Sequence, residues 1–102
     1  MDLKPGSRWR SAVCDGEFVV VRPPKSPASL ECGGQPVIAH AEMRDPAAAP
    51  SPDHAGGSQA GKRYTDAETG LEALCSKAGA GSLSVDGRAI GAVEAKKLPS
   101  SD

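Results

Sequence analysis

The bulky hydrophobic residues of this chain fall into two separated groups. The first group runs from Trp9 to Ile38 and the second from Leu71 to Leu98. Both groups contain short runs of β-forming residues that are bounded by glycine, proline and aspartate. Residues 41–61, which separate them, contain almost no bulky apolar side chain. The pattern predicts a small all-β protein in which two short ordered segments pack together.

In the first group, residues 8–22 (RWRSAVCDGEFVVVR) carry Trp, Phe and a run of Val, interrupted at Asp15-Gly16. Because Asp-Gly is a strong hairpin signal, we expect a short strand, a tight turn and a longer strand. Three prolines then predict a loop over residues 23–28, since proline cannot donate to a β ladder. The chain is expected to return as a strand over residues 30–38 that turns at Gly33-Gly34.

In the second group, we expect a strand around Leu71 to Cys75, a Gly-rich turn at residues 79–81 and a strand over SLSV. A turn at Asp86-Gly87 would then let the chain pair back on itself. The sequence TDAETGLEALCSK also fits a short helix with an N-terminal cap, but Gly70 in its interior favours the strand. No internal repeat is evident.

These elements divide the chain into four parts. We expect a first lobe over residues 1–40, a flexible linker over 41–61, a C-terminal β segment over 62–98 that packs on the first lobe, and a frayed tail over 99–102. The linker is rich in Pro, Ala, Gly and Ser, which cannot bury enough apolar surface to offset the entropy of ordering.

Composition and charge exclude some classes of protein. With 102 residues, 3% aromatic residues, 12 Gly and 9 Pro, the core must be thin, and cores of this size usually need a metal, a disulfide or a partner chain. The net charge of −1 and scattered Lys and Arg argue against a nucleic-acid partner. Neither a membrane span nor a secretory signal is evident, so we expect a cytoplasmic protein without membrane contact.

The candidate chemistry lies in the three cysteines, Cys14, Cys32 and Cys75. An odd number in a reducing compartment argues against a simple disulfide framework. Cys14 lies in the first predicted turn and Cys32 directly precedes Gly33-Gly34. Such knuckles, tight turns beside a glycine, direct backbone N–H groups at a thiolate sulfur. The seventeen intervening residues suffice for a strand, a loop and a returning strand to bring both turns to one end of a sheet.

Residues 9–37 (WRSAVCDGEFVVVRPPKSPASLECGGQPV) resemble desulforedoxin and the similar rubredoxin-like N-terminal domain of some superoxide reductases. In that family an aromatic residue precedes a C-x-x-C-G knuckle, a Val-rich strand follows, and the second knuckle has the form L-x-C-C-G-x-x-M. The matching positions are Trp9, Cys14, Val19 to Val21, Leu30, Cys32 and Gly34 to Pro36. The resemblance implies a desulforedoxin-like β-hairpin lobe and a homodimer.

Two departures bear on the metal of that family. Ser11 stands at the position of the first cysteine and Gly33 at that of the fourth, so a tetrathiolate iron site cannot form within this segment. The catalytic iron of superoxide reductases lies in a separate domain with several histidines. This chain has only His40 and His54, so that activity is not expected.

Three interpretations of the cysteines remain open. Cys14, Cys32 and Cys75 could bind zinc together with His40, which lies eight residues after Cys32, or less favourably with His54. Alternatively, the knuckles are scaffold and the thiols are small buried hydrophobic groups. In the third interpretation, Cys14 and Cys32 form a reversible disulfide.

No catalytic constellation is evident in the sequence. We therefore expect a non-catalytic binding or accessory module without a cofactor, which binds a protein partner or its own copy. The alternative is a small metal protein that holds structural zinc, or iron for electron transfer, through Cys14, Cys32 and Cys75.

Overall fold

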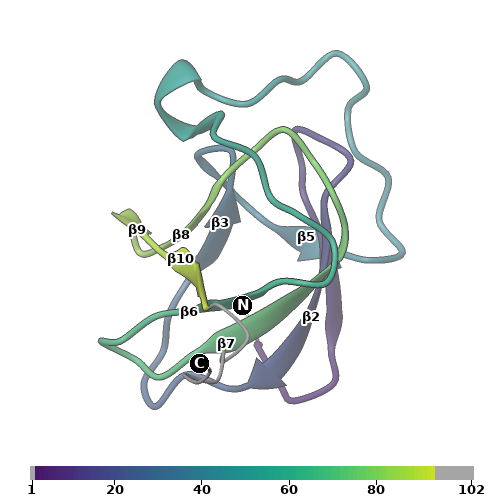
Figure 1. Cartoon of the computed structure of the whole chain (residues 1–102). Helices are drawn as coiled ribbons and strands as arrows, with labels where there is room; N and C mark the ends of the chain where they lie inside the picture. Colours follow the sequence, from purple (N-terminus) through teal and green to yellow (C-terminus); the bar gives the residue numbers. More distant parts are fainter. Residues whose placement is uncertain (1, 94–102) are drawn as a thin grey trace, which may run out of the picture.

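The computed structural model describes residues 2–93, and its regular elements are almost all β strands (Figure 1). The elements are β1 (Arg8–Arg10), β2 (Glu17–Arg22), β3 (Leu30–Cys32), β4 (Gln35–Pro36), β5 (Ile38–Ala39), the 3-10 helix η1 (Pro52–His54), β6 (Arg63–Thr65), β7 (Glu72–Lys77), β8 (Leu83–Val85), β9 (Arg88–Ala89) and β10 (Gly91–Val93). The predicted all-β class is confirmed. The predicted tail over 99–102, and residues 94–98 of the C-terminal segment, lie outside the described residues.

The strands form two antiparallel sheets, and each half of the chain contributes to both. The six-stranded sheet has the order β10-β6-β7-β2-β1-β5, and the four-stranded sheet has the order β4-β3-β8-β9. The halves meet where β2 pairs with β7 and where β3 pairs with β8. The N-terminal and C-terminal segments are therefore joined through two shared sheets.

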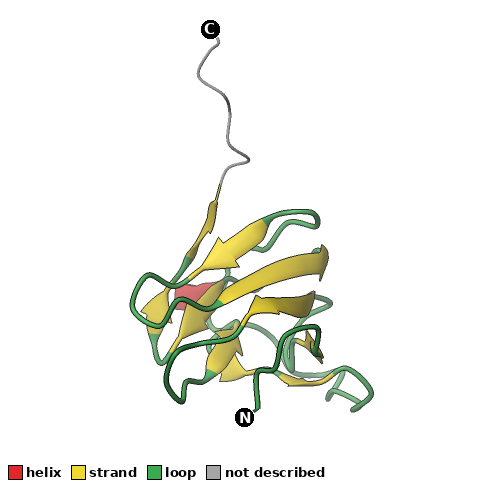
Figure 2. Ribbon diagram, turned by 90° about the horizontal axis from the view of Figure 1, so that it is seen from below, coloured by secondary structure: helices red, strands yellow, loops and turns green. Residues whose placement is uncertain are grey.

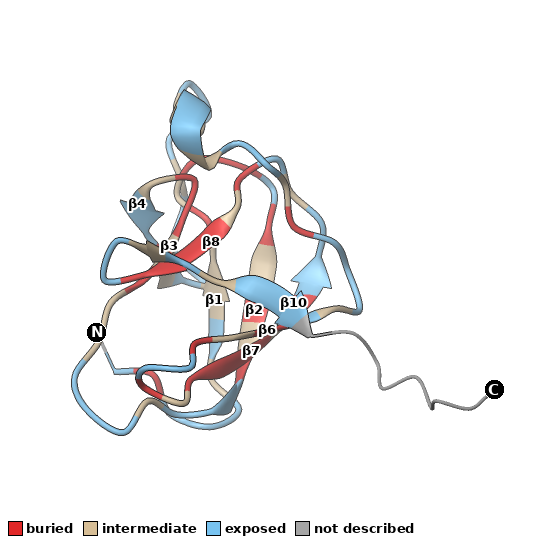
Figure 3. Cartoon of the chain, turned by 60° about the vertical axis from the view of Figure 1, so that its left-hand side comes forward, coloured by how far each residue is buried: buried red, intermediate tan, exposed pale blue. Residues whose placement is uncertain are grey.

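Alternation along the strands places one face of each sheet in a common core. On β2, Phe18 and Val20 are fully buried while Val21 is exposed, as the two-residue period of a strand requires. Figure 3 shows buried segments concentrated on β3, β7 and β8. The fully buried hydrophobic side chains of the core are Phe18, Val20, Leu30, Cys32, Leu71, Ala73, Cys75, Leu83 and Val85.

The two halves of the chain repeat the same arrangement of strands, although no repeat is evident in the sequence. In each half a hairpin is followed by a strand, a turn and a strand, and the last strand returns to pair with the first: β5 pairs with β1, and β10 with β6. The register is also repeated, since Trp9 lies opposite Phe18 and Tyr64 lies opposite Ala73. The described structure is therefore an internal duplication of one supersecondary unit.

The contacts between the halves are reciprocal, as a local two-fold axis requires. Across β2 and β7, Phe18 pairs with Cys75 and Val20 with Ala73, with Val19 and Leu74 at the centre. Hydrogen bonds follow the same symmetry: the Gly33 N–H donates to the Ser82 carbonyl (2.9 Å), and the Asp86 N–H donates to the Ser29 carbonyl (3.0 Å).

The predicted turns at Gly33-Gly34 and Asp86-Gly87 are confirmed and are equivalent in the two halves. Their φ angles are +67° and +89° in the first turn and +50° and +83° in the second. Two successive residues with positive φ are typical of a type I′ hairpin turn, which favours glycine and aspartate.

The strand predicted around Leu71 to Cys75 is confirmed as β7, and the helical alternative for this segment is wrong. Residues 66–70 form a turn, and Gly70 has a φ of +80°. A residue in this left-handed conformation would interrupt a helix, but it lets the chain reverse before β7.

The predicted linker, residues 41–61, contains a long loop and then contacts the sheets. Figure 2 shows η1, which this segment contributes, beside the strands. The Ser51 N–H donates to the Gly33 carbonyl (3.0 Å), and the Ser82 N–H donates to the His54 carbonyl (2.9 Å). These bonds attach the second part of the segment to the β3–β4 turn and to the residue that precedes β8. Within the described residues, no helix is long and apolar enough to cross a membrane.

Candidate functional site

The structure brings Cys14 and Cys32 together in the core. Their sulfur atoms are 3.8 Å apart, and both residues are buried. Cys14 lies in the connection between β1 and β2, while Cys32 ends β3 immediately before the Gly33-Gly34 turn. We call these two residues the thiol pair.

Ser11 organises the turn that carries Cys14. Its hydroxyl oxygen accepts hydrogen bonds from the N–H groups of Val13 and Cys14, each 3.1 Å long. The Ser11 N–H donates to the Gly16 carbonyl (2.8 Å), which closes the turn. Where the resembling family has a cysteine, this chain thus uses a hydroxyl group to satisfy buried backbone donors.

Backbone N–H groups from two segments point at the Cys14 sulfur. The N–H groups of Gly16 and Gly81 each donate to this sulfur at 3.4 Å. Gly16 belongs to the same turn, whereas Gly81 comes from the segment between β7 and β8. This is the knuckle arrangement expected from the sequence, with one donor supplied by the other half of the chain.

Residues 79–81, which we call the glycine cover, pack closely on the thiol pair. A methyl group at Gly79 would lie 2.7 Å from the Cys14 sulfur, and one at Gly81 would lie 3.0 Å from the Cys32 sulfur. The methyl group at Gly81 would also lie 2.8 Å from the Gly33 nitrogen. Real side chains do not approach neighbouring atoms more closely than about 3.0 Å, so only glycine fits at either position without a shift of the backbone. The cover explains why both thiols are buried in so small a protein.

The three thiols differ in their acidity. Burial would raise the pKa of Cys14, but hydrogen bonds from Ser11 and from the Gly16 and Gly81 N–H groups lower it below its ordinary value. Burial raises the pKa of Cys32 to about 12, with a further contribution from the neighbouring Cys14. Burial also raises the pKa of Cys75. Cys14 is therefore the sulfur best suited to react as a thiolate.

Cys75 lies near the thiol pair but is engaged differently. It pairs with Phe18 across the β2–β7 ladder and is fully buried. Its thiol donates a hydrogen bond to the Lys77 carbonyl (3.1 Å). The proton on this sulfur is thus held by a specific acceptor.

The structure places the candidate histidines apart from the thiol pair. His40 Nε2 lies 3.0 Å from Glu17 Oε1, in a surface hollow that is also lined by Arg8, Val19, Ser76 and Lys77. His54 belongs to η1 and packs over Gly34. Among residues 2–93, no group of three or more His, Cys, Asp or Glu side chains is arranged to hold a metal ion. The set Cys14, Cys32, Cys75 and His40 is therefore not assembled in this structure.

The second half of the chain contains the same turn, built with oxygen in place of sulfur. Asp66 Oδ2 accepts a hydrogen bond from the Thr69 N–H (3.1 Å), as Ser11 does from Cys14. The Leu71 N–H donates to Thr69 Oγ1 (3.3 Å), and the Asp66 N–H donates to the Leu71 carbonyl (2.9 Å). Asp66 thus corresponds to Ser11, and Thr69 corresponds to Cys14. We call residues 66–71 the oxygen turn.

No family model, curated protein or solved structure matches this chain. The resemblance to desulforedoxin stays a prediction that rests on residues 9–37. The internal duplication supplies a comparison within the chain itself, because each thiol has an equivalent position in the other half. Val85 occupies the place of Cys32, and Val20 the place of Cys75.

The oxygen turn predicts a dependence of stability on pH. Burial would raise the pKa of Asp66, but hydrogen bonds from Thr69, Arg88 and the Glu68 N–H hold it below its ordinary value. A carboxyl whose pKa is lower in the folded state stabilises the protein fully above its unfolded pKa, about 4. This contribution is lost as the pH falls through the folded pKa. We expect the difference in melting temperature between the wild type and Asp66→Asn to shrink below about pH 4.

Thermal unfolding of both proteins between neutral and strongly acidic pH would measure this effect. A difference that stays constant across the whole range would show that the ionised carboxylate does not contribute to folding.

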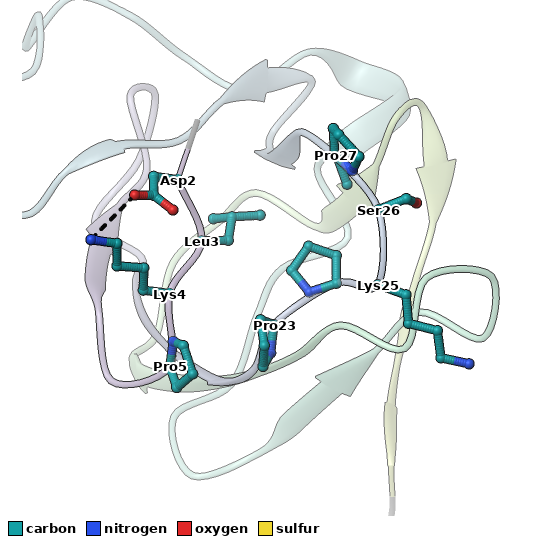
Figure 4. A pocket seen from close by; sticks show the side chains of 10 residues that line it. Asp2, Leu3, Lys4, Pro5, Pro23, Lys25, Ser26 and Pro27 are labelled. Atoms are coloured by element: carbon teal, nitrogen blue, oxygen red, sulfur yellow. Dashed lines mark ion pairs between the residues drawn. The ribbon is translucent and has the colours of Figure 1, made fainter.

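A second hollow, of about 370 Å³, lies between the N-terminal residues and the loop over residues 23–28 (Figure 4). Its lining includes Pro5, Pro23 and Pro27, and Asp2 forms an ion pair with Lys4 (3.5 Å) at its edge. No cysteine or histidine lines this hollow, so it is separate from the thiol pair and from both candidate histidines.

Proposed function

We propose that this chain is a small non-catalytic binding or accessory module in which two related knuckle-like turns serve as scaffold. One observation carries this proposal: the oxygen turn keeps the hydrogen bonds of the Cys14 turn although it contains no sulfur. A turn that forms with Asp66 and Thr69 does not need a metal for its shape. The thiols of the first turn can therefore be packing groups of a fold that is stabilised by its two shared sheets.

The arrangement of reactive groups favours a non-catalytic role. The thiol pair lies beneath the glycine cover, so a bulky substrate could not reach either sulfur without opening the structure. Ser76 shares its hollow with His40 and Glu17. No hydrogen bond between Ser76 and His40 is found in the described structure, so the serine lacks the activated geometry of a nucleophile.

In such a module, a partner would be bound by surface residues and not by the buried thiols. The hollow around His40 presents Arg8 and Lys77 beside Glu17, so a polar partner would find charges of both signs there. We propose a protein partner or a second copy of this chain, rather than nucleic acid or a membrane. Because the halves already share both sheets, a second copy would pair most readily through a sheet edge such as β4, β5, β9 or β10.

The alternative function is a small metal protein that binds zinc or iron through Cys14, Cys32 and Cys75. It is favoured by the two N–H groups that point at the Cys14 sulfur, because knuckle turns stabilise metal-bound thiolates in this way. It would require the Cys75 thiol to give up its hydrogen bond to Lys77.

A double substitution that copies the second half of the chain distinguishes the two functions. Cys14→Thr/Cys32→Val gives the first half of the chain the residues that the second half has at the equivalent positions, Thr69 and Val85. We expect this variant to fold cooperatively with a loss of about 1–2 kcal/mol, because the replacements are close in volume. Urea denaturation would measure the loss, and the native mass of anaerobically purified protein would report bound metal.

Cys75→Val is the matched control, since it removes the third thiol and introduces the residue found at Val20. One zinc or iron ion per wild-type chain, together with loss of cooperative folding in the double variant, would refute the scaffold function and support the metal protein.

A further inference from the structure

The thiol pair places two reactive side chains close together, and the scaffold function gives them no chemical role. The sulfur atoms are 3.8 Å apart. A disulfide requires about 2.05 Å, so the two atoms need to approach by less than about 2 Å. The turns that carry Cys14 and Cys32 already aim both side chains at one point. We propose that this pair is an oxidation site that forms a reversible disulfide with a small peroxide as oxidant.

The surroundings assign different roles to the two sulfurs. Cys14 retains 6% of its exposure, whereas Cys32 has none, so an entering oxidant meets Cys14 first. The Gly16 and Gly81 N–H groups donate to the Cys14 sulfur, which stabilises its thiolate. The lowered pKa of Cys14 and the raised pKa of Cys32 agree with this assignment. Cys14 attacks the oxidant, and Cys32 resolves the product.

The chemistry balances with hydrogen peroxide as the only co-reactant. The Cys14 thiolate attacks one peroxide oxygen, so an S–O bond forms, the O–O bond breaks and hydroxide leaves with the proton of the thiol as water. Cys32 then attacks the sulfur of the Cys14 sulfenic acid. An S–S bond forms, the S–O bond breaks, and the leaving hydroxide takes the Cys32 proton as water. Two thiols and one peroxide thus give one disulfide and two waters.

The glycine cover limits the size of the oxidant that can reach the thiol pair. Gly79 and Gly81 approach the sulfurs too closely to leave room for a peptide or a bulky disulfide compound. Cys75 is not expected to take part, because its thiol donates to the Lys77 carbonyl from a separate strand. Its place near the pair makes it the natural internal control.

The experiment treats the full reduced chain with a small excess of hydrogen peroxide. The reaction is then stopped by unfolding the protein in an alkylating reagent. We expect one alkyl group per chain instead of three, on Cys75, and a mass otherwise two hydrogen atoms below that of the reduced chain. Peptide mapping should link Cys14 with Cys32. A thiol reductant should restore three alkylated cysteines. Cys75→Val should form the same link.

Cys32→Val tests the order of the steps. Without a resolving thiol, we expect the reaction to stop at the Cys14 sulfenic acid, which a dimedone reagent would trap. If this variant does not fold, mapping of the wild type and of Cys75→Val still decides the question.

Three results would overturn the proposal. These are full alkylation of all three thiols after peroxide treatment, a link that includes Cys75, or a link between two chains. The proposal does not rest on the scaffold function. A metal-free protein that never forms the disulfide would refute the oxidation site alone. One metal ion per wild-type chain and loss of cooperative folding in the double variant, while peroxide still links Cys14 with Cys32 in the metal-free chain, would refute the scaffold alone.

Discussion

Replacement of Asp66 by alanine is expected to lower the free energy of unfolding by about 3–5 kcal/mol. The Asp66 side chain is 4% exposed and accepts hydrogen bonds from the Thr69 N–H and hydroxyl group. It also accepts bonds from the Glu68 N–H and from Arg88, the latter at 2.8 Å. Alanine would leave the N–H and hydroxyl group of the buried Thr69 without this acceptor, and each buried unsatisfied donor is costly. Urea denaturation at neutral pH would measure the loss.

Asp15→Ala is the matched control for this prediction. Asp15 also lies in the connection between the first two strands of its half and forms an ion pair, with Arg44 at 2.9 Å. Its side chain is 69% exposed, however, so its removal should cost at most about 1 kcal/mol. Equal losses in the two variants would contradict the conclusion that Asp66 holds the oxygen turn together.

The local elements of the fold could be predicted because their signals are local. The run of Val in residues 17–22 is bounded by glycine and proline, and it forms β2. The Asp86-Gly87 pair adopts the positive φ angles that such a turn requires. Each of these features depends on residues within one short stretch of chain.

The pairing of distant strands could not be predicted in the same way. Contacts of β2 with β7 and of β3 with β8 join residues fifty or more positions apart. The internal duplication is not visible in the sequence because equivalent positions in the two halves have the same structural role but different amino acids. Ser11 and Asp66 both accept backbone N–H groups, although one does so with a hydroxyl and the other with a carboxylate. The signal that could have revealed the duplication is the pair of patterns S-x-x-C at residues 11–14 and D-x-x-T at residues 66–69, each of which follows the first strand of its half.

In the candidate site, too, local features could be predicted from the sequence and contacts between distant segments could not. The approach of Cys14 to Cys32 follows from two turns within residues 11–34. The position of the glycine cover depends instead on how the second half of the chain packs against the first. The sequence of residues 79–81 by itself predicts only a turn. His40 is eight residues from Cys32 along the chain, yet its ring contacts Glu17 because β5 pairs with β1. Distance along the sequence therefore gave no guide to the surroundings of this histidine.

Replacement of Gly79 by alanine is expected to destabilise the protein by about 2–3 kcal/mol and to expose Cys14. A methyl group at this position would lie 2.5 Å from the Gly16 nitrogen and 2.7 Å from the Cys14 sulfur. The nitrogen belongs to the backbone of the Cys14 turn, so it cannot rotate away as a flexible side chain could. The glycine cover would have to lift, which would also strain the paired backbone hydrogen bonds between Gly79 and Ser58 (2.9 and 3.2 Å).

Two measurements on the same variant check this prediction, namely urea denaturation and the rate of Cys14 alkylation in the native protein. Gly91→Ala is the control, because nothing lies within 4 Å of an added methyl group there, and it should change stability by at most about 0.5 kcal/mol. A Gly79 variant with wild-type stability and an unchanged alkylation rate would show that the cover does not shield the thiol. Faster alkylation with the expected loss of stability would instead identify the packing of Gly79 against Gly16 as the barrier between Cys14 and solvent. The same variant should then form the Cys14–Cys32 disulfide faster with peroxide, because Cys14 would be more exposed to the oxidant.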